Sequence, residues 1–285
     1  MKQYPYVFPY FGYDETSAGN VLIHKFCHLI NELGGKAYMA TDITHPDLNT
    51  PKINNIQGVD DKCIVVSPEN INHLTYGGDY IVKYIQADYE KIGRGKVDLA
   101  GVDDVWCFAK TLFPKHWGGE VKVCHFNTVD LSLFNEDEKF ERKGNICYVG
   151  RMGGKVDTSI LKDMKDLTAI THDFPKDRKD LIKLMRSSEW CYIFSNTSIG
   201  SEAIMCGCPV VMHENFSMAY AFDEYGEDGK LYGMAIGNSL EQMEWAKKTV
   251  KKFQEKVYWH ESQKEKRVLA FMEDTQKGLH EKLLG

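Results

Sequence analysis

Short apolar runs alternate with longer amphipathic segments along most of this chain, and the alternation strongly constrains its fold. Residues 6–11 are apolar and prone to form a strand, and a turn-rich loop follows them. Over residues 18–33 the apolar side chains recur at helical spacing, and the pair Gly34-Gly35 suits the end of that helix. A short strand is expected at residues 36–40. A strand–helix–strand unit of this length predicts a right-handed parallel crossover.

The same alternation continues to a helical tail that begins at residue 239. In the first half, strands are expected at residues 63–67, 105–109 and 121–126, and residues 80–90 are interpreted as a helix. In the second half, strands are expected at residues 145–150, 167–171, 191–194 and 209–212, with helices at 158–164, 177–188 and 199–206.

A charged segment without core positions, residues 131–144, separates the two series and is interpreted as a linker. The predicted fold class is therefore α/β, with two Rossmann-like, doubly wound domains that face a cleft. The predicted domains are residues 1–135 and 136–245. Residues 246–285 are expected to be C-terminal helices that pack back on the first domain. Ligands of such sheets bind beyond the carboxyl ends of the strands.

Composition excludes several classes of protein. The 285 residues carry a net charge of −6, which argues against a dedicated nucleic-acid surface. The eight cysteines lack the spacing of a zinc site and suit reduced, buried thiols. No apolar run approaches the roughly 20 residues that span a bilayer, and the N-terminal stretch lacks the apolar core of a signal peptide. These observations predict a cytoplasmic protein without a metal.

The segment SNTSIGSEAIMCGCPVVM, residues 195–212, is the most informative single stretch. It is typical of a loop, a short helix, a tight turn and a buried strand. A helix N-terminus attracts anions through its free N–H groups and its dipole. Thr197 and Ser198 could supply donors to a phosphate or sugar, and Glu202 could accept hydrogen bonds from a ribose. The alternative for Glu202 is an acid that only complements the helix dipole.

Two further loops could approach a phosphate. In YVGRMGGK, residues 148–155, Arg151 and Lys155 follow a predicted strand, and two cations there suit a diphosphate. The alternative is a solvated basic turn. In GYDETSAGN, residues 12–20, Gly19 lies near the start of the first long helix and would allow close backbone approach, with Ser17 as a possible cap. Neither loop has the spacing of a dinucleotide-binding or P-loop motif.

The segment SPENINH, residues 67–73, follows a buried strand of the first domain. Glu69 and His73 should therefore lie at the carboxyl edge of the sheet, where either could contact the acceptor or the transferred sugar. A turn acid and a surface histidine are the equally weighted alternative.

These motifs resemble one known family. SIGSEAIMCGCPVV is similar to the donor segment of retaining GT-B glycosyltransferases, and YVGRMGGK resembles their diphosphate-binding segment. SPENINHLTYGG looks closest to the polysaccharide and rhamnosyl-type branch of the family 4-like enzymes. The resemblance implies that Arg151 and Lys155 hold the diphosphate and act in catalysis, and that Glu202 holds the ribose. The family often has a second acid eight positions earlier, where this chain has Phe194.

The expected function is transfer of a sugar from a UDP-, GDP- or dTDP-sugar to a glycan or other hydroxyl acceptor. Catalytic roles are expected for Arg151, Lys155 and Glu69, with the acceptor on the first predicted domain and the nucleotide-sugar on the second. No metal is expected if the two cations suffice, and no cofactor is expected because the nucleotide-sugar is itself a substrate. Acceptors could be glycans, lipid-linked glycans or small molecules, and the tail could contact a membrane surface. Stable nucleic-acid binding is not expected. The alternatives are a nucleotide-sugar epimerase or hydrolase of similar fold, and a non-catalytic scaffold.

Overall fold

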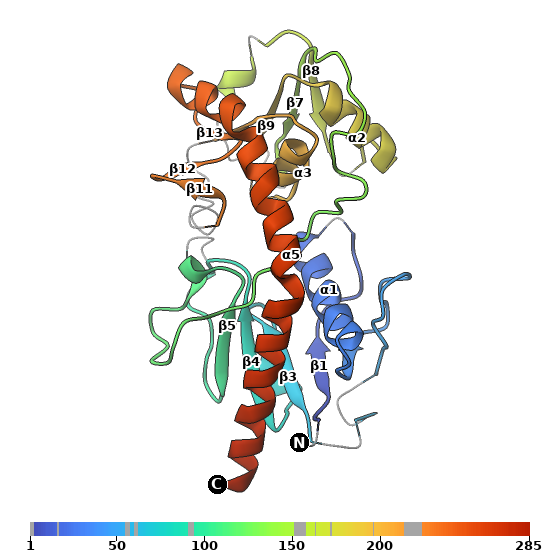
Figure 1. Cartoon of the computed structure of the whole chain (residues 1–285), viewed down its shortest axis with the longest axis vertical. Helices are drawn as coiled ribbons and strands as arrows, with labels where there is room; N and C mark the ends of the chain where they lie inside the picture. The colour runs from blue at the N-terminus through green and yellow to red at the C-terminus, as the bar shows by residue number, and fades with distance from the viewer. Residues whose placement is uncertain are drawn as a thin grey trace. The chain divides into compact units, whose positions relative to one another are not determined.

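The computed structural model describes residues 3–15, 17–54, 58–59, 62–90, 94–150, 158–162, 164–171, 173–195, 197–213 and 224–285. The chain divides into two compact units, which Figure 1 shows in the colours of the sequence. The first unit comprises Met1–Thr128 together with His260–Gly285, and the second comprises Val129–Trp259. The long helix α5 (Leu240–Leu284) contributes residues 240–259 to the second unit and its remainder to the first.

The first unit is built on a parallel sheet of six strands with the order β2-β1-β3-β4-β5-β6. Its strands are β1 (Tyr6–Pro9), β2 (Ala37–Ala40), β3 (Ile64–Pro68), β4 (Tyr80–Ile85), β5 (Asp104–Cys107) and β6 (Lys122–Val123). Between β1 and β2 lies α1 (Ala18–Glu32), and single 3-10 turns follow β3 and β5 at η2 (His73–Thr75) and η3 (Lys110–Leu112).

The helix α1 and the C-terminal part of α5 cover one face of this sheet (Figure 1). Phe26 of α1 and Phe271 of α5 meet with ring centroids 4.7 Å apart, and both belong to the same core as Tyr84 of β4. Burial of such aromatic side chains stabilises the fold by about 1.5–3 kcal/mol each. The apolar period of 3.6 along α1 therefore serves to cover the sheet.

The prediction of a helix over residues 80–90 is wrong, because its first half is the central strand β4. All six residues of β4 are buried, and Lys83 in its middle is 1% exposed. A lysine within an apolar run suggests an amphipathic helix, whereas here the fold buries the lysine and satisfies its ammonium group locally.

The second unit contains a parallel sheet of five strands with the order β13-β10-β9-β7-β8. The strands are β7 (Asn145–Tyr148), β8 (Leu167–Ile170), β9 (Trp190–Ile193), β10 (Val210–Met212) and β13 (Met234–Ile236). The helices α2 (Arg178–Ser187) and α3 (Ile199–Met205) follow β8 and β9. A small antiparallel hairpin joins β11 (Gly226–Glu227) to β12 (Lys230–Leu231).

Both faces of the second sheet are covered, as its nearly continuous apolar strands require. Cys191 and Ile193 pack with α2 and α3 in one core, whereas Trp190 and Tyr192 pack on the opposite face with Ala246 of α5. The helix expected at residues 158–164 is limited to the 3-10 turn η5 (Ser159–Leu161). Two parallel α/β sheets confirm the predicted fold class.

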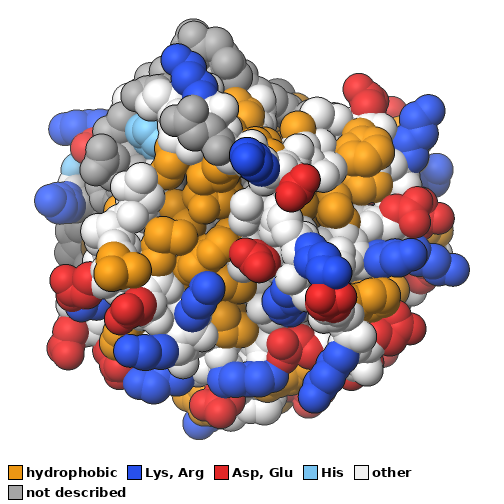
Figure 2. Space-filling view, turned by 90° about the horizontal axis from the view of Figure 1, so that it is seen from above, with side chains coloured by type: hydrophobic (Ala, Val, Ile, Leu, Met, Phe, Trp, Pro, Cys, Tyr) orange, Lys and Arg blue, Asp and Glu red, His pale blue; other side chains and the backbone are white. Residues whose placement is uncertain are grey.

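The eight cysteines are all buried and free, as their apolar surroundings predict. Within the described ranges, no helix combines the length and apolarity needed to cross a bilayer. On the face drawn in Figure 2, lysine and arginine side chains are interspersed with aspartate and glutamate, and hydrophobic side chains lie between them.

Candidate functional site

The carboxyl edge of the second sheet brings several of the predicted site residues together. Thr197 and Ser198 lie between the end of β9 and the start of α3, and Glu202 lies in the first turn of α3. The hydroxyl oxygen of Thr197 accepts a hydrogen bond from the backbone N–H of Ile199 at 3.3 Å. The side chain of Ser198, the residue before α3, makes no capping hydrogen bond. The Thr197 side chain therefore satisfies one backbone N–H at the start of α3.

Glu202 is a nearly buried carboxylate at this edge, with 9% of its surface exposed. Burial raises the pKa of Glu202, and the positive charge of Arg178 and a hydrogen bond with Ser198 lower it in opposition. Arg178 Nη2 lies 3.8 Å from Glu202 Oε1, an ion-pair distance beyond that of a direct hydrogen bond. Since burying a carboxylate costs free energy, this position is more consistent with a binding group than with a surface acid.

Arg178 is a member of this cluster that the sequence interpretation missed. It is the first residue of α2, and its guanidinium group lies 5.2 Å from the centroid of the Phe134 ring. A cation in the first turn of a helix opposes the helix dipole, so its presence there was a signal that could have been noticed.

The end of β7 approaches the same loop. Gly150 has a φ of +67°, and a Cβ placed on it would lie 2.9 Å from the Cβ of Ser195. Only a glycine therefore allows the segment after β7 to pass this close to the segment after β9. Arg151 and Lys155 belong to residues 151–157, which lie outside the described residues, so their predicted roles stay predictions.

A cavity of about 350 Å³ opens at the carboxyl ends of β9, β10 and β13. Its lining is mixed: Tyr192, Phe194, Val211, Met212, Ile160 and Ile236 are apolar, while Ser159, His213, Asn238 and Ser239 bring polar groups. An apolar cavity with a few polar groups is the usual form of a small-molecule site.

Phe194 occupies the position where the resembled family often has an acid, and here its ring lines this cavity. The rings of Phe194 and His213 lie 5.7 Å apart, and Phe194 is 2% exposed. Whatever enters the cavity meets an aromatic face and an imidazole instead of a carboxylate at this point. His213 was not among the predicted site residues, because a single histidine after a strand carries no motif.

In the first unit, Glu69 follows β3 at the carboxyl edge of that unit's own sheet. Glu69 Oε2 accepts a hydrogen bond of 2.9 Å from the backbone N–H of Gln86, which follows β4. Burial raises the pKa of Glu69 to about 7, against the opposing effects of backbone N–H donors and the charge of Lys83. A carboxyl group with a pKa near 7 suits proton exchange with a substrate hydroxyl.

Gly19 lies beside Gln86, whose backbone N–H donates to Glu69. A Cβ on Gly19 would come within 3.0 Å of Gln86 Oε1 and 3.4 Å of the Tyr10 hydroxyl. Gln86 Oε1 is buried without a hydrogen-bond partner among the described residues. An unsatisfied buried acceptor next to a glycine leaves a polar position that a ligand hydroxyl could satisfy. The side chain of Ser17, expected to cap α1, makes no capping hydrogen bond.

His73, grouped with Glu69 on sequence, belongs to the interior. It is 0% exposed, its Nε2 lies 2.7 Å from the carbonyl oxygen of Ala100, and its Nδ1 lies 3.4 Å from Lys83 Nζ. Lys83 Nζ also donates to the carbonyl oxygen of Ile71 at 2.6 Å. This network holds the loop that carries Glu69, so His73 has a structural position and no access to a ligand. No cluster of three or more potential metal-binding side chains occurs within the described parts of either unit.

No protein-family model matches the chain, and the search of curated proteins finds no match to its sequence. Solved structures do match. The glycosyltransferase AviGT4, involved in avilamycin A biosynthesis, superposes with a TM-score of 0.58 at 11% identity, covering 97% of this chain and 98% of that one. An alpha-glucosyltransferase in complex with UDP gives 0.50 at 10% identity, with 95% of each chain covered. The same TM-score and identity hold for an alpha-glucosyltransferase bound to UDP and a 13-mer DNA, covering 97% and 100%.

These matches extend over nearly the whole length of both chains. The chain therefore has the two-unit, Rossmann-like fold found in these glycosyltransferases.

Proposed function

We propose that this protein is a glycosyltransferase that moves a sugar from a nucleotide-sugar donor to a hydroxyl acceptor. The single observation that carries the proposal is the nearly buried carboxylate of Glu202, at the carboxyl edge of a parallel sheet and on the same edge as a mixed cavity. Nucleotides bind at this edge in α/β folds. The solved structures with the same fold include glycosyltransferases, and two of them hold UDP.

In this proposal Glu202 accepts hydrogen bonds from the ribose hydroxyls, and Thr197 and Ser198 lie near the phosphates or the sugar. Arg151 and Lys155 neutralise the charge that develops on the leaving diphosphate. In this proposal the positive charges of Arg151 and Lys155 replace the charge stabilisation that a divalent metal would otherwise provide, so the reaction is proposed to be metal-independent. The mixed cavity beside Phe194 and His213 takes part of the donor.

The carboxyl edge of the first unit is proposed to receive the acceptor. Glu69, with its pKa near 7, orients the attacking hydroxyl, and Gln86 contacts the rest of the acceptor. Gly19, near the start of α1, is proposed to allow close backbone approach to the donor. The family resemblance favours retention of the anomeric configuration and a glycan, lipid-linked or small-molecule acceptor. The anomeric proton coupling of the product, measured by NMR, tests retention directly.

A thermal-shift panel with UDP, GDP, dTDP and their sugars tests donor binding. A ligand at 100 times its Kd stabilises the folded state by about 2.7 kcal/mol, which raises the melting temperature by several degrees. Absence of a response to every nucleotide would overturn the proposal.

A non-catalytic scaffold is the second candidate, favoured by the aromatic ring of Phe194 at the position of the usual acid. Nucleotide release from the stabilising sugar nucleotide, followed with a panel of glycan acceptors, separates the two. Binding without release in any acceptor mixture supports the scaffold.

A further inference from the structure

A second pocket, of about 470 Å³, lies in the second unit between the β11–β12 hairpin and α5. Its volume falls in the range of roughly 300–1,000 Å³ that is usual for ligand sites. None of its six lining residues lines the cavity at the carboxyl edge of the sheet. The functional proposal above therefore leaves this pocket unused. The lining residues are Glu227, Tyr232, Lys252, Glu255, Lys256 and Trp259.

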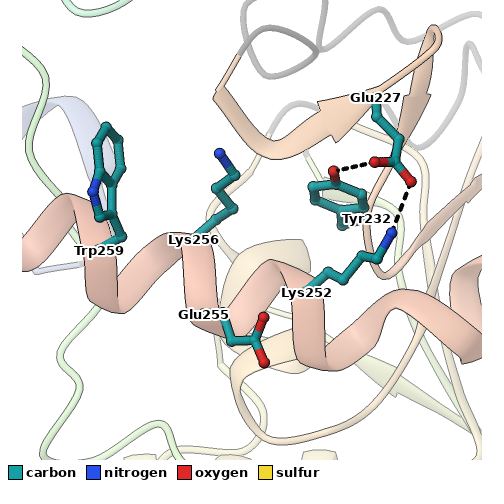
Figure 3. A pocket seen from close by; sticks show the side chains of 6 residues that line it. All are labelled: Glu227, Tyr232, Lys252, Glu255, Lys256 and Trp259. Carbon is teal, nitrogen blue, oxygen red and sulfur yellow. Dashed lines mark hydrogen bonds and ion pairs between the residues drawn. The ribbon is translucent and has the colours of Figure 1, made fainter.

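The geometry of α5 brings four of these side chains to one face. Positions 252, 255, 256 and 259 follow the spacing i, i+3, i+4 and i+7, which places them along one stripe of a helix. Figure 3 shows Lys252, Lys256 and Trp259 in a row along the helix, with Glu227 and Tyr232 across from them. The pocket is thus built from a rigid helix and from a hairpin held against it.

One end of the pocket is organised by a fixed polar triad. Lys252 Nζ lies 2.8 Å from Glu227 Oε1, and the Tyr232 hydroxyl donates to Glu227 Oε2 at 2.8 Å. The ammonium group of Lys252 also lies 5.3 Å from the centroid of the Tyr232 ring. Because Glu227 and Lys252 form an ion pair, their charges cancel, and this end of the pocket presents polar atoms with little net charge.

The other end presents an aromatic surface. Trp259 is 49% exposed, and Lys256 Nζ lies 5.5 Å from the centroid of its ring. Figure 3 shows the indole standing up from α5 beside Lys256, on the side where the pocket lies. An exposed tryptophan offers a large, rigid apolar face at a small cost in side-chain entropy.

The chemistry of the lining selects among ligand classes. Two lysines and two glutamates give the pocket a formal charge of zero, which disfavours a phosphate, a nucleotide or a nucleic-acid backbone. Charged groups around the aromatic ring disfavour an apolar helix, which needs an apolar groove. A pyranose ring has C–H groups on its faces, which pack on an indole, and hydroxyl groups at its rim, which both donate and accept hydrogen bonds. The pocket offers an indole for the C–H face, lysine donors for the hydroxyl oxygens and glutamate acceptors for the hydroxyl hydrogens.

We propose that this pocket is a carbohydrate-binding site for a neutral oligosaccharide, separate from the site of sugar transfer. A sugar ring packs on Trp259, Lys256 donates to its hydroxyls, and Glu255 accepts from them. The next residue of the oligosaccharide reaches the polar triad around Glu227. The inference rests on the lining of the pocket and holds whether or not the protein is a transferase. For a glycan acceptor, such a site would raise the local concentration of chain ends.

The test uses the full-length protein without any nucleotide. Maltohexaose, cellohexaose, laminarihexaose, mannohexaose and chitohexaose in its N-acetylated form serve as probes, and binding is measured by saturation-transfer NMR and calorimetry. At least one probe is expected to bind, and Trp259→Ala is expected to weaken it at least tenfold. Trp259→Phe keeps a smaller ring and should retain part of the affinity.

Tyr258→Ala provides the matched control. Tyr258 is the preceding residue of the same helix, is 51% exposed, and does not line the pocket. Its removal should leave the affinity unchanged, and circular dichroism checks that each variant is folded. Binding to none of the five probes would overturn the proposal, as would equal losses in Trp259→Ala and Tyr258→Ala.

Two further measurements separate this site from sugar transfer. A heparin hexasaccharide binding better than every neutral probe would refute the neutral ligand class. Competition by saturating UDP, or loss of probe binding in Glu202→Gln, would place the sugar at the carboxyl edge and also refute the proposal. A failure of nucleotide binding in the thermal-shift panel would remove the UDP competition but leave the neutral probes, the heparin comparison and the Trp259→Ala test unaffected.

Discussion

Replacing Glu202 with glutamine removes one negative charge and keeps the shape of the side chain. The carboxylate is 9% exposed and is not consumed by Arg178, whose Nη2 stands 3.8 Å from Oε1. A hydrogen bond to a charged group contributes about 1.5–3 kcal/mol. In the proposed site, loss of the charge-assisted bond from Glu202 to the ribose predicts a dissociation constant for the nucleotide about 10- to 150-fold higher.

The same change should not weaken the fold. The pKa of Glu202 is raised by burial, so between its unfolded pKa and its folded pKa the native state holds more protons than the unfolded state. The contribution of this group to stability is complete at low pH and is lost as the pH rises through that window. Glutamine has no such loss, so Glu202→Gln should be at least as stable as the wild type at neutral pH.

Isothermal titration with UDP and with its 2′,3′-dideoxy analogue isolates the ribose contact. The penalty of Glu202→Gln should be large for UDP and nearly absent for the analogue, because the analogue lacks the hydroxyls that Glu202 would bind. Glu189→Gln, at the exposed residue just before β9, is the control at the opposite edge of the sheet. An unchanged affinity for UDP, or an equal penalty for both ligands, would refute the assignment of Glu202.

Three further expectations concern other parts of the two sheets. Burial lowers the pKa of Lys83 to about 8, so the unfolded state holds more protons than the native state between pH 8 and 10.5. The free energy of unfolding of the wild type should therefore rise by up to about 3 kcal/mol over that range. Urea unfolding of Lys83→Met should lack this rise, and an equal pH dependence of the two proteins would contradict the burial of the Lys83 charge. Glu69→Gln should lower kcat at least tenfold and remove the pH dependence of kcat near pH 7, which steady-state kinetics measures. Donor affinity, measured by calorimetry, should not change, and an unaltered pH profile would exclude Glu69 from proton exchange. Gly150→Ala should lower the free energy of unfolding by about 1–2 kcal/mol through the positive φ of residue 150 alone, with a further loss from the clash with Ser195. Chemical unfolding measures the loss, and a wild-type unfolding curve would argue against this close approach.

Much of the fold follows from local sequence pattern. The apolar period of 3.6 over residues 18–33 predicts a helix, and α1 spans Ala18–Glu32. The segment 195–212 predicts a loop, a short helix, a turn and a strand, which the structure shows as α3 and β10. These patterns are legible because each element needs one apolar side to bury, and the spacing of that side records the type of element.

The residue Glu202 is the part of the site for which sequence reasoning reached furthest. Its position in the first turn of a helix after a buried strand places it at the carboxyl edge of a parallel sheet. What the pattern did not contain is the burial of its carboxylate and the presence of Arg178, which begins a different helix. Contacts between residues 24 positions apart depend on how α2 and α3 pack together.

Tertiary structure alone decided the state of the polar groups in the first unit. Lys83 lies in a strand because Ile71 and Ser67 accept its hydrogen bonds, and these partners come from the neighbouring strand and the loop that follows it. His73 is interior for the same reason, since its Nε2 lies 2.7 Å from the carbonyl oxygen of Ala100. A buried polar side chain is stable only with such partners, and one-dimensional spacing does not identify them.

The sequence by itself determined two α/β series, the place of Glu202 and the loops that could meet a phosphate, because periodicity and turn residues are local properties. The tertiary structure decided that residues 80–85 form a strand, that Phe194 and His213 share a cavity, and that Trp259, Tyr232 and Glu227 line a second pocket. Each of these depends on side chains brought together from separate elements. These arrangements are stabilised by burial and pairing of side chains from separate elements, and a local sequence pattern does not specify such contacts.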